Sequence, residues 1–425
     1  MKNKSFLILI LALSILLTVK EVYAESYIIS TDARDQMDSS NRSLARSSDG
    51  KLHCVYISMS YGVYYTYSTD QGATWTEEQI ATNGNDIGPY HQFNPAIAID
   101  SQDNLHVVWE GEGWGTNKGW PNIQYRKRTS AGWQAQEAVT DVSVEQRNPC
   151  IAIDSQDNVH VVWKWNTDWY CDQSGISYRK RTAAGWQARE NLTGTMEHQS
   201  SPSIAIDSQN NVHVAWTDFD NIRYRKRTSS GWQASELVTN VALNDLQIGV
   251  CIAIDSADNI HLVWSGEGWG TYKDWRNIQY RKRTAAGWGS HEQVTDINLG
   301  QYTASISIDS ADNIHVAWSG GNEGAGEWQY RKKTATGWQN QETIDKSIDK
   351  EFISLIWAMH PTVSGNKPNV PATGFALIYI NQDKNLIFYK SSDLAWPGYT
   401  PPNTPSTPSG PSSGVTDTSY SFSTS

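Results

Sequence analysis

The sequence is poor in the two sulfur-containing residues, cysteine and methionine. It holds 4 Cys and 5 Met among 425 residues, and no two cysteines have the spacing Cys-x-x-Cys. This pattern argues against a cysteine-rich zinc site, and a disulfide is expected only if the chain is exported. Apolar runs of transmembrane length are also lacking, because the one long run, residues 6–19, is too short and too early.

Positive charge is in the minority as well. The chain has 34 Lys and Arg against 45 Asp and Glu, a formal net charge of −11. Such a molecule repels nucleic acid and anionic lipid, so no polynucleotide partner is predicted. Basic residues do recur as Arg-Lys-Arg triplets, which we interpret as alternating solvent-facing positions on one repeated strand. The triplets lie at residues 126–128, 179–181, 225–227 and 281–283.

The N-terminal residues have the features of an export signal. Lys2 and Lys4 precede the apolar run, and Val-Tyr-Ala at residues 22–24 supplies small residues for cleavage. We expect a signal peptide over residues 1–24 and no membrane span after its removal. The protein is therefore predicted to be secreted, extracellular or at the cell surface, with the periplasm as the alternative compartment.

Aromatic residues and glycine are abundant, with 20 Trp, 20 Tyr and 31 Gly, and this composition favours strands joined by turns. A unit of about fifty residues repeats along the chain. Its clearest mark is a histidine between two apolar residues, at positions 106, 160, 213, 261 and 315. Each unit reads as four short strands bounded by Asn, Asp and Gly, which is typical of a β-propeller blade.

The count of repeats predicts how the ring closes. A seventh copy near residues 361–390 has three strands, and residues 27–30 can supply its fourth strand from the other end of the chain. The sequence therefore predicts an all-β, seven-bladed β-propeller over residues 25–396, with six blades as the alternative. Residues 397–425 are rich in Pro, Ser and Thr and are expected to form a flexible linker or tail.

One turn carries a family resemblance. Ser68-x-Asp70-x-Gly72-x-x-Trp75 resembles the Asp-box, or BNR repeat, of the sialidase-like propellers. In this motif the Asp caps backbone N–H groups, the Gly permits a positive φ, and the Trp fills the gap between blades. The resemblance implies the fold and the superfamily, and because the motif is a folding element it says little about catalysis.

A repeated glutamine offers candidate ligand-binding residues. It stands eight residues before the Asp that ends the first strand of a blade, and that strand is the innermost one in a propeller. The side chains are expected to ring one mouth of the central channel as a polar floor for a ligand, or to be structural amides. They are Gln92, Gln146, Gln199, Gln247 and Gln301.

Residues that do not repeat point to the loops between second and third strands, which are long in blades two, three and five. Exposed aromatics beside carboxylates and amides suit sugar rings, which have an apolar face and a rim of hydroxyls. The alternative is that the tryptophans anchor their own loops. The predicted binding residues are Glu112, Trp114, Trp120, Trp169, Glu267, Trp269 and Trp275.

The resemblance to sialidase-like propellers also implies a hydrolase alternative, with three arginines, a Tyr–Glu nucleophile pair and an acid/base Asp. Arg42 and Asp86 are placed like the first arginine and the acid/base, although Arg42 lacks the proline that follows it in the family pattern. Arg147 and Arg276 are the candidates for the other arginines. Glu267 with Tyr302 is the candidate nucleophile pair.

Three further expectations concern metal sites, a disulfide and the function. The repeated histidines and the Asp-Ser-x-Asp-Asn turns are interpreted as structural rather than as metal or calcium sites, and no cofactor is predicted. Cys150 and Cys171 are predicted to form a disulfide that holds the long loop of blade three. The function predicted is non-catalytic recognition of a glycan or cell-surface ligand, with a sialidase-type hydrolase and a protein-binding scaffold as alternatives.

Overall fold

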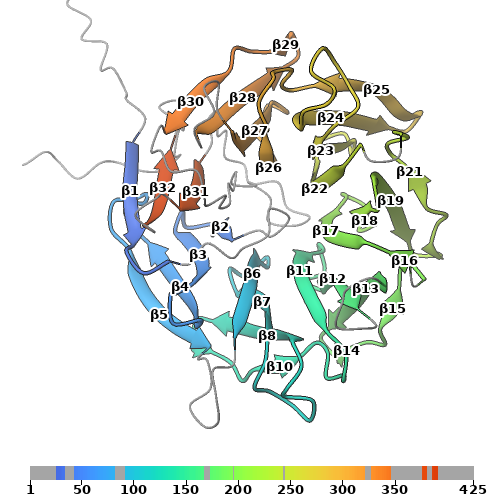
Figure 1. Cartoon of the computed structure of the whole chain (residues 1–425). Helices are drawn as coiled ribbons and strands as arrows, with labels where there is room; N and C mark the ends of the chain where they lie inside the picture. The colour runs from blue at the N-terminus through green and yellow to red at the C-terminus, as the bar shows by residue number, and fades with distance from the viewer. Residues whose placement is uncertain are drawn as a thin grey trace, which may run out of the picture.

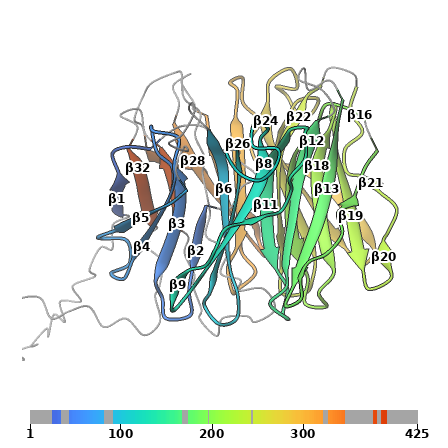
Figure 2. The ribbon, with the colours of Figure 1, turned by 90° about the horizontal axis from the view of Figure 1, so that it is seen from below.

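The computed structural model describes residues 25–33, 43–81, 91–166, 173–194, 196–242, 245–320, 327–345, 376–380 and 385–390. All regular secondary structure in these residues is β-strand, and the strands form seven antiparallel sheets around a ring (Figure 1). Figure 2 shows the sheets standing side by side, with their strands running between the two faces of the ring. No helix of membrane-spanning length and hydropathy occurs in the described residues.

The first three blades follow one another in sequence order. Blade 1 contains β2 (Leu44–Arg46), β3 (Leu52–Ile57), β4 (Val63–Ser68) and β5 (Thr76–Ala81). Blade 2 contains β6 (Gln92–Ile99), β7 (Leu105–Gly111), β8 (Asn122–Thr129), β9 (Gly132–Trp133) and β10 (Glu137–Ala138). Blade 3 contains β11 (Gln146–Ile153), β12 (Val159–Asn166), β13 (Gln173–Thr182), β14 (Gly185–Trp186), β15 (Glu190–Asn191) and β16 (Met196–Glu197).

The next three blades repeat the pattern. Blade 4 contains β17 (Gln199–Ile206), β18 (Val212–Asp218), β19 (Asn221–Thr228), β20 (Gly231–Trp232) and β21 (Glu236–Leu237). Blade 5 contains β22 (Gln247–Ile254), β23 (Ile260–Gly266), β24 (Asn277–Thr284) and β25 (Gly287–Gln293). Blade 6 contains β26 (Tyr302–Ile308), β27 (Ile314–Ser319), β28 (Trp328–Thr334), β29 (Gly337–Trp338) and β30 (Glu342–Asp345).

The remaining sheet, called the closing sheet below, joins the two ends of the described chain. It has the order β1 (Glu25–Ser30), β32 (Leu386–Lys390) and β31 (Ala376–Ile380). The predicted pairing of the N-terminal strand with the last sheet is confirmed, because Tyr27 lies opposite Phe388 in an antiparallel ladder. Six blades with four or more strands are thus present in the described residues. The innermost strand expected near Pro361 lies outside them.

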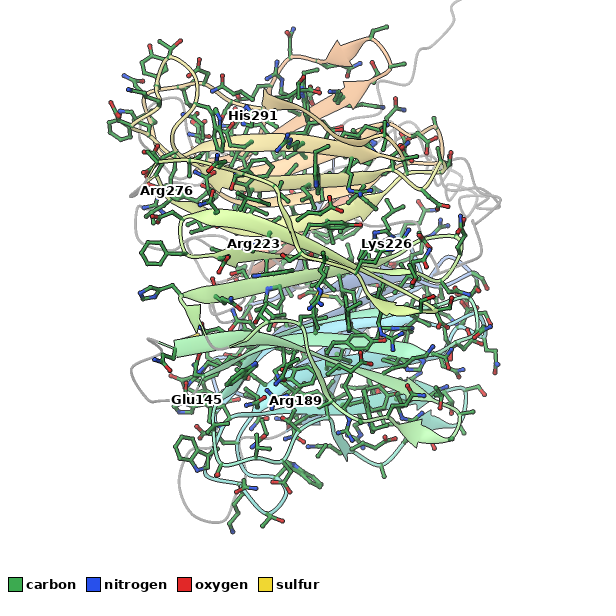
Figure 3. The ribbon with its side chains drawn as sticks, turned by 90° about the vertical axis from the view of Figure 1, so that its right-hand side faces the viewer. Glu145, Arg189, Arg223, Lys226, Arg276 and His291 are labelled. Carbon is green, nitrogen blue, oxygen red and sulfur yellow. The ribbon has the colours of Figure 1, made fainter. Side chains whose placement is uncertain are left out.

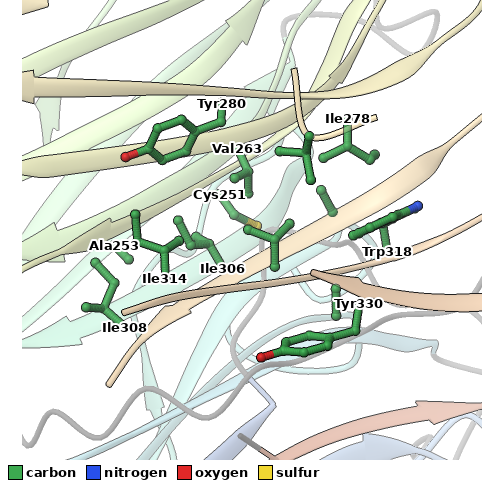
Figure 4. Packing of buried hydrophobic residues seen from close by; sticks show 14 of the residues in the cluster. Cys251, Ala253, Val263, Ile278, Tyr280, Ile306, Ile308, Ile314, Trp318 and Tyr330 are labelled. Atoms are coloured by element: carbon green, nitrogen blue, oxygen red, sulfur yellow. The ribbon is translucent and has the colours of Figure 1, made fainter. Parts of the chain in front are cut away.

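The hydrophobic core lies between neighbouring blades rather than inside one sheet. Figure 4 shows one such layer, in which Val263 and Tyr280 of blade 5 face Ile314 and Trp318 of blade 6. Middle strands are covered on both faces, so β7 is buried at every position. Each fully buried large apolar side chain in these layers contributes about 1.5–3 kcal/mol to folding. Ile387 of the closing sheet belongs to the same cluster as blade 6.

The repeated histidine is a structural element of each blade. In blade 2 the Nδ1 atom of His106 lies 2.7 Å from the Tyr125 hydroxyl, and its Nε2 atom lies 3.0 Å from Asp100. Blades 3 to 6 repeat this network with their own His, Tyr and Asp. A neutral imidazole satisfies all these groups, since it accepts from the tyrosine and donates to the carboxylate. Burial accordingly lowers the pKa of His106, although Asp100 opposes this.

The Arg-Lys-Arg triplets hold blades together, which corrects the expectation that they face solvent. Arg181 of blade 3 donates two hydrogen bonds to Glu137 of blade 2, at 2.9 and 2.8 Å. The Trp186 indole N–H donates to the same carboxylate at 2.8 Å. Lys180, the middle residue, lies 3.2 Å from Asp154. Equivalent clamps to Glu78, Glu190 and Glu236 join other neighbouring blades.

The turn from Ser68 to Trp75 has the geometry predicted from its residues. Asp70 accepts hydrogen bonds from the Thr74 backbone N–H at 2.8 Å and from the Thr74 hydroxyl at 2.6 Å. Gly72 adopts a φ of 91°, which disfavours any other residue there. The Trp75 ring packs edge-on against Phe388, with centroids 5.4 Å apart. This turn therefore joins blade 1 to the closing sheet.

Candidate ligand-binding face

The ring has two chemically different faces. One carries the tight turns that follow the first and third strands, including the Asp-Ser-x-Asp-Asn turns. The other, called the long-loop face below, carries the loops between second and third strands and the connections between blades. Figure 3 shows Arg276 and Glu145 at this face and Lys226 toward the opposite one.

Turns on the opposite face are held by contacts between neighbouring blades. Ser101 of blade 2 donates to Asp157 of blade 3 through its backbone N–H and its hydroxyl, both at 2.8 Å. Asp100 accepts the backbone N–H of Asn104 at 2.8 Å. These carboxylates are used as turn caps and blade links, as the structural interpretation of the turns expected. Among the described residues no group of three or more His, Cys, Asp or Glu is arranged to hold a metal ion.

Exposed apolar side chains gather on the long-loop face. Eight large hydrophobic side chains are exposed in the described residues, and the two that belong to outer strands are Ile28 and Leu237. The other six lie in loops of the long-loop face or directly beside it, and such a concentration on one side marks an interaction surface. They are Met59, Trp114, Phe219, Leu246, Tyr272 and Trp275.

Two loops of this face are each held by a carboxylate three residues after the outer strand of their own blade. In blade 2 the backbone N–H groups of Thr116 and Asn117 donate to Asp141, both at 2.8 Å. In blade 5 the backbone N–H groups of Thr271 and Tyr272 donate to Asp296, both at 3.0 Å. A loop fixed in this way loses little conformational entropy when a ligand binds.

The predicted tryptophans differ in how far they reach solvent. Trp114 is 52% exposed and Trp275 is 47% exposed, so both can stack on a ligand. Trp120 is half-buried. Trp269 stacks on His291, with ring centroids 4.2 Å apart, and so anchors its own loop, which was the alternative interpretation. Trp169 lies outside the described residues.

Carboxylates of the loops have basic neighbours. Glu112 is half-buried, and burial raises its pKa although His91 and Arg147 oppose this. Glu267 lies 3.5 Å from the Arg276 guanidinium. That guanidinium also stands 5.0 Å from the centre of the Tyr302 ring, at the start of blade 6. The structure thus brings Glu267 and Tyr302 to the same cation, and Arg276 is engaged by both.

At the boundary between blades 2 and 3, Arg147 binds two carboxylates. It donates to Glu145 at 2.9 Å and to Glu110 at 3.2 Å. Glu110 also accepts the backbone N–H of Asn148 at 2.7 Å. Burial raises the pKa of Glu110 although Arg147 opposes it. Burial alone would lower the pKa of Arg147, but the two carboxylates raise it above its usual range.

The first strands bulge where they reach this face. Register shifts interrupt their pairing with the second strands, and the residues there have positive φ values. Asn148 has a φ of 54°, and Thr303 has a φ of 54° although it is β-branched. A non-glycine residue rarely adopts this conformation, and bulges are frequent beside binding sites because they re-aim side chains. The bulges therefore direct Arg147 and Tyr302 toward the long-loop face.

Sequence reasoning placed the repeated glutamines at a mouth of the channel, and the structure places their side chains inside the blades. Gln92, Gln146, Gln247 and Gln301 accept the indole N–H of their own blade's tryptophan at 2.6 to 2.8 Å. Gln199 donates instead to Asp218, at 3.2 Å. All five are at most 1% exposed, so they are structural amides and are left out of the candidate site.

The described part of the chain contains only some of the residues that the hydrolase alternative needs. Arg42 and Asp86 lie outside the described residues. Arg147 and Arg276 are both held by carboxylates of this chain, which reduces the charge available for a substrate carboxylate. Cys150 is buried in β11, and its predicted partner Cys171 lies outside the described residues, so that disulfide stays a prediction.

Two functional candidates were missed by sequence reasoning. Glu110 follows the repeated Trp109, where blades 3 to 6 have Lys164, Thr217, Ser265 and Ser319. His291 lies beneath Trp269 on the outer strand of blade 5, where burial lowers its pKa to about 4. The sequence could have indicated Glu110, because the residue after the repeated tryptophan differs from blade to blade. A position that varies in this way is not required by the blade fold.

No protein-family model matches the sequence, and no curated protein matches it either. Solved structures match it in fold. A polysaccharide lyase of family PL25, an ulvan lyase bound to -[GlcA(1-4)Rha3S]-, has a TM-score of 0.63 and 8% identity, covering 87% of this chain and 96% of that one. A protein of unknown function from Dyadobacter fermentans has a TM-score of 0.50 and 8% identity, covering 71% of this chain and 94% of that one. Likenesses at this identity support the β-propeller fold alone.

Proposed function

We propose that this protein is an exported, seven-bladed β-propeller that binds carbohydrate through its long-loop face without cleaving it. The closing sheet supports the blade count, because it packs against blade 6 through Ile387 and against blade 1 through Phe388. Its innermost strand would come from the residues before β31. Export rests on the signal-like residues 1–24.

The single observation that carries the proposed binding is the exposure of Trp114 and Trp275 on rigid loops. Their indole rings are about half exposed, while Asp141 and Asp296 fix the backbone beside them. A flat apolar ring held next to carboxylates and amides matches the two surfaces of a pyranose, its apolar face and its hydroxyl rim. The carbohydrate partner of the ulvan lyase agrees with such a ligand, although the similarity to this chain is one of fold.

Kinship with the Asp-box propellers is a further part of the proposal. It rests on the turn from Ser68 to Trp75, which has the capped geometry that the motif requires. The same kinship implies the hydrolase alternative, for which Arg42 and Asp86 are the residues to change. A protein-binding scaffold is the remaining alternative, since exposed apolar side chains also suit a protein partner.

The experiment is a glycan microarray probed with the mature chain, residues 25–425, and a fluorogenic sialoside assay on the same preparation. We expect binding without turnover, and binding weaker by about fivefold or more when Trp114 and Trp275 are both changed to Ala, since a lost aromatic stack costs of order 1 kcal/mol or more. Leu237→Ala is the matched control, because Leu237 is exposed on an outer strand instead. Turnover lost in Asp86→Asn would replace the proposal by the hydrolase alternative.

A further inference from the structure

The long loops of blades 2 and 5 are two copies of one element. Residues 111–122 read Gly-Glu-Gly-Trp-Gly-Thr-Asn-Lys-Gly-Trp-Pro-Asn, and residues 266–277 read Gly-Glu-Gly-Trp-Gly-Thr-Tyr-Lys-Asp-Trp-Arg-Asn. They differ only at Asn117/Tyr272, Gly119/Asp274 and Pro121/Arg276. The blade fold itself does not require this loop sequence, because blades 1 and 4 connect the same two strands by short loops, residues 58–62 and 219–220.

The two copies also share one conformation. The Gly113 N–H donates to the Lys118 carbonyl at 2.8 Å, and the Gly268 N–H donates to the Lys273 carbonyl at the same distance. Gly113 and Gly268 both have a φ of 93°. The hydrogen bonds from the loop backbone to Asp141 and Asp296 are also equivalent. These contacts show that the backbone of the blade 5 loop repeats that of the blade 2 loop.

The copies stand apart on the ring. Figure 1 shows blade 2 and blade 5 on opposite sides, with blades 3 and 4 between them in one direction. In the other direction blade 6, the closing sheet and blade 1 intervene. Each loop rests on the outer strand of its own blade, so each exposed tryptophan belongs to a separate surface.

The copies present different aromatic rings. Blade 5 has His291 beneath Trp269, where blade 2 has Gln136, and the stacking leaves Trp275 and Tyr272 as the exposed rings. Blade 2 exposes Trp114 instead. The copies differ at this position of the outer strand and at three positions of the loop, including Tyr272, while the hydrogen bond and the φ value given above are the same in both. The two surfaces are therefore related in chemistry but unequal.

We propose that these loops are two independent sites for the same class of ligand, neutral pyranose chains, so that one molecule holds two sugar segments at once. This inference rests on the proposed carbohydrate binding. Each loop carries as many acidic as basic residues, Glu112 with Lys118 in residues 111–122, and Glu267 and Asp274 with Lys273 and Arg276 in residues 266–277. Balanced charge next to an exposed ring favours neutral hydroxyl-rich sugars over polyanions. Two sites on one rigid body raise affinity for a polymer above that for a short oligosaccharide.

The test is isothermal titration calorimetry of the mature chain with cellohexaose, xylohexaose, mannohexaose and an ulvan oligosaccharide. We expect two sites per chain for a neutral hexasaccharide. Trp114→Ala and Trp275→Ala should each reduce the stoichiometry to one, and the double variant should abolish binding. Leu237→Ala is the matched control, because Leu237 is 42% exposed but lies on the outer strand β21 rather than in the loops of the long-loop face.

Each other outcome overturns a defined claim. A single site that both tryptophan variants abolish would show one binding surface, which overturns the two-site inference and leaves the proposed function standing. Binding of the ulvan oligosaccharide alone would overturn the preference for neutral sugars. Absence of binding to all four probes would overturn the proposed function and the two-site inference with it. Circular dichroism melting curves that match wild type show that each variant is folded.

Discussion

The clamps between blades make a stability prediction that can be worked out from the structure. Glu137 on the outer strand of blade 2 accepts two hydrogen bonds from Arg181 and one from the Trp186 indole. A hydrogen bond to a charged group contributes about 1.5–3 kcal/mol when buried and a neutral one about 1 kcal/mol. The side chains of Arg181 and Glu137 are 26% and 33% exposed, so solvent weakens the pair. We therefore expect Glu137→Gln to destabilise the protein by about 2 kcal/mol, since the amide keeps the shape but points an N–H group at donors.

The assay is urea unfolding followed by tryptophan fluorescence, supported by calorimetric melting. Glu342→Gln is the matched control, because Glu342 lies opposite Tyr330 as Glu137 lies opposite Tyr125, but it is exposed and makes no clamp in the described residues. The control should change stability by less than about 0.5 kcal/mol. Equal midpoints for the two variants would refute the view that the clamp adds to the stability that the apolar layer gives to neighbouring blades.

Three further outcomes follow from single residues. Burial lowers the pKa of His53 to about 4, so its imidazole stays neutral in the fold while the unfolded chain takes up a proton below about pH 6.5. Stability should fall as the pH is lowered from 6.5 to 4, and His53→Gln should reduce the slope of this part of a pH series of urea midpoints, because the other buried histidines still contribute to it. Gly111→Ala should destabilise by about 2 kcal/mol because its Cβ would lie 2.0 Å from a buried amide, whereas Gly119→Ala, with open space around its Cβ, should be near neutral by the same assay. Trp264→Phe should destabilise by about 1 kcal/mol more than Trp216→Phe, because only Trp264 donates its indole N–H to a glutamine, and equal melting temperatures would contradict this.

The loops of the long-loop face are not needed to hold the blades together. Strand pairing and interblade clamps fix every blade, so the loops between second and third strands can vary without cost to the core. Blades 2 and 5 carry the same long loop, while blade 4 turns with Phe219 and Asp220 alone. If the proposed function holds, binding residues are added at selected blades of a regular ring, and the number of such blades sets the number of binding sites.

Much of the fold was determined by the sequence itself. The repeat with its histidine predicted the blades, and the spare strand at residues 27–30 predicted the ladder between β1 and β32. Local chemistry sufficed there, because strand alternation and Asp-capped turns act over a few residues. The turn at Asp70 is one example, since its hydrogen bonds to Thr74 lie within that turn.

Only the tertiary structure decided which repeated residues are available to a ligand. Gln92 could have faced the channel or its own tryptophan, and in the folded blade it accepts the indole N–H of Trp109. Arg181 looked solvent-facing from its place in the strand, but its partner Glu137 stands forty-four residues earlier, in another blade. Trp114 and Trp269 occupy one position of one loop, and a histidine on the adjacent strand separates their roles. Partners that are distant in sequence meet only when the blades pack, so burial and exposure are properties of the ring rather than of the repeat.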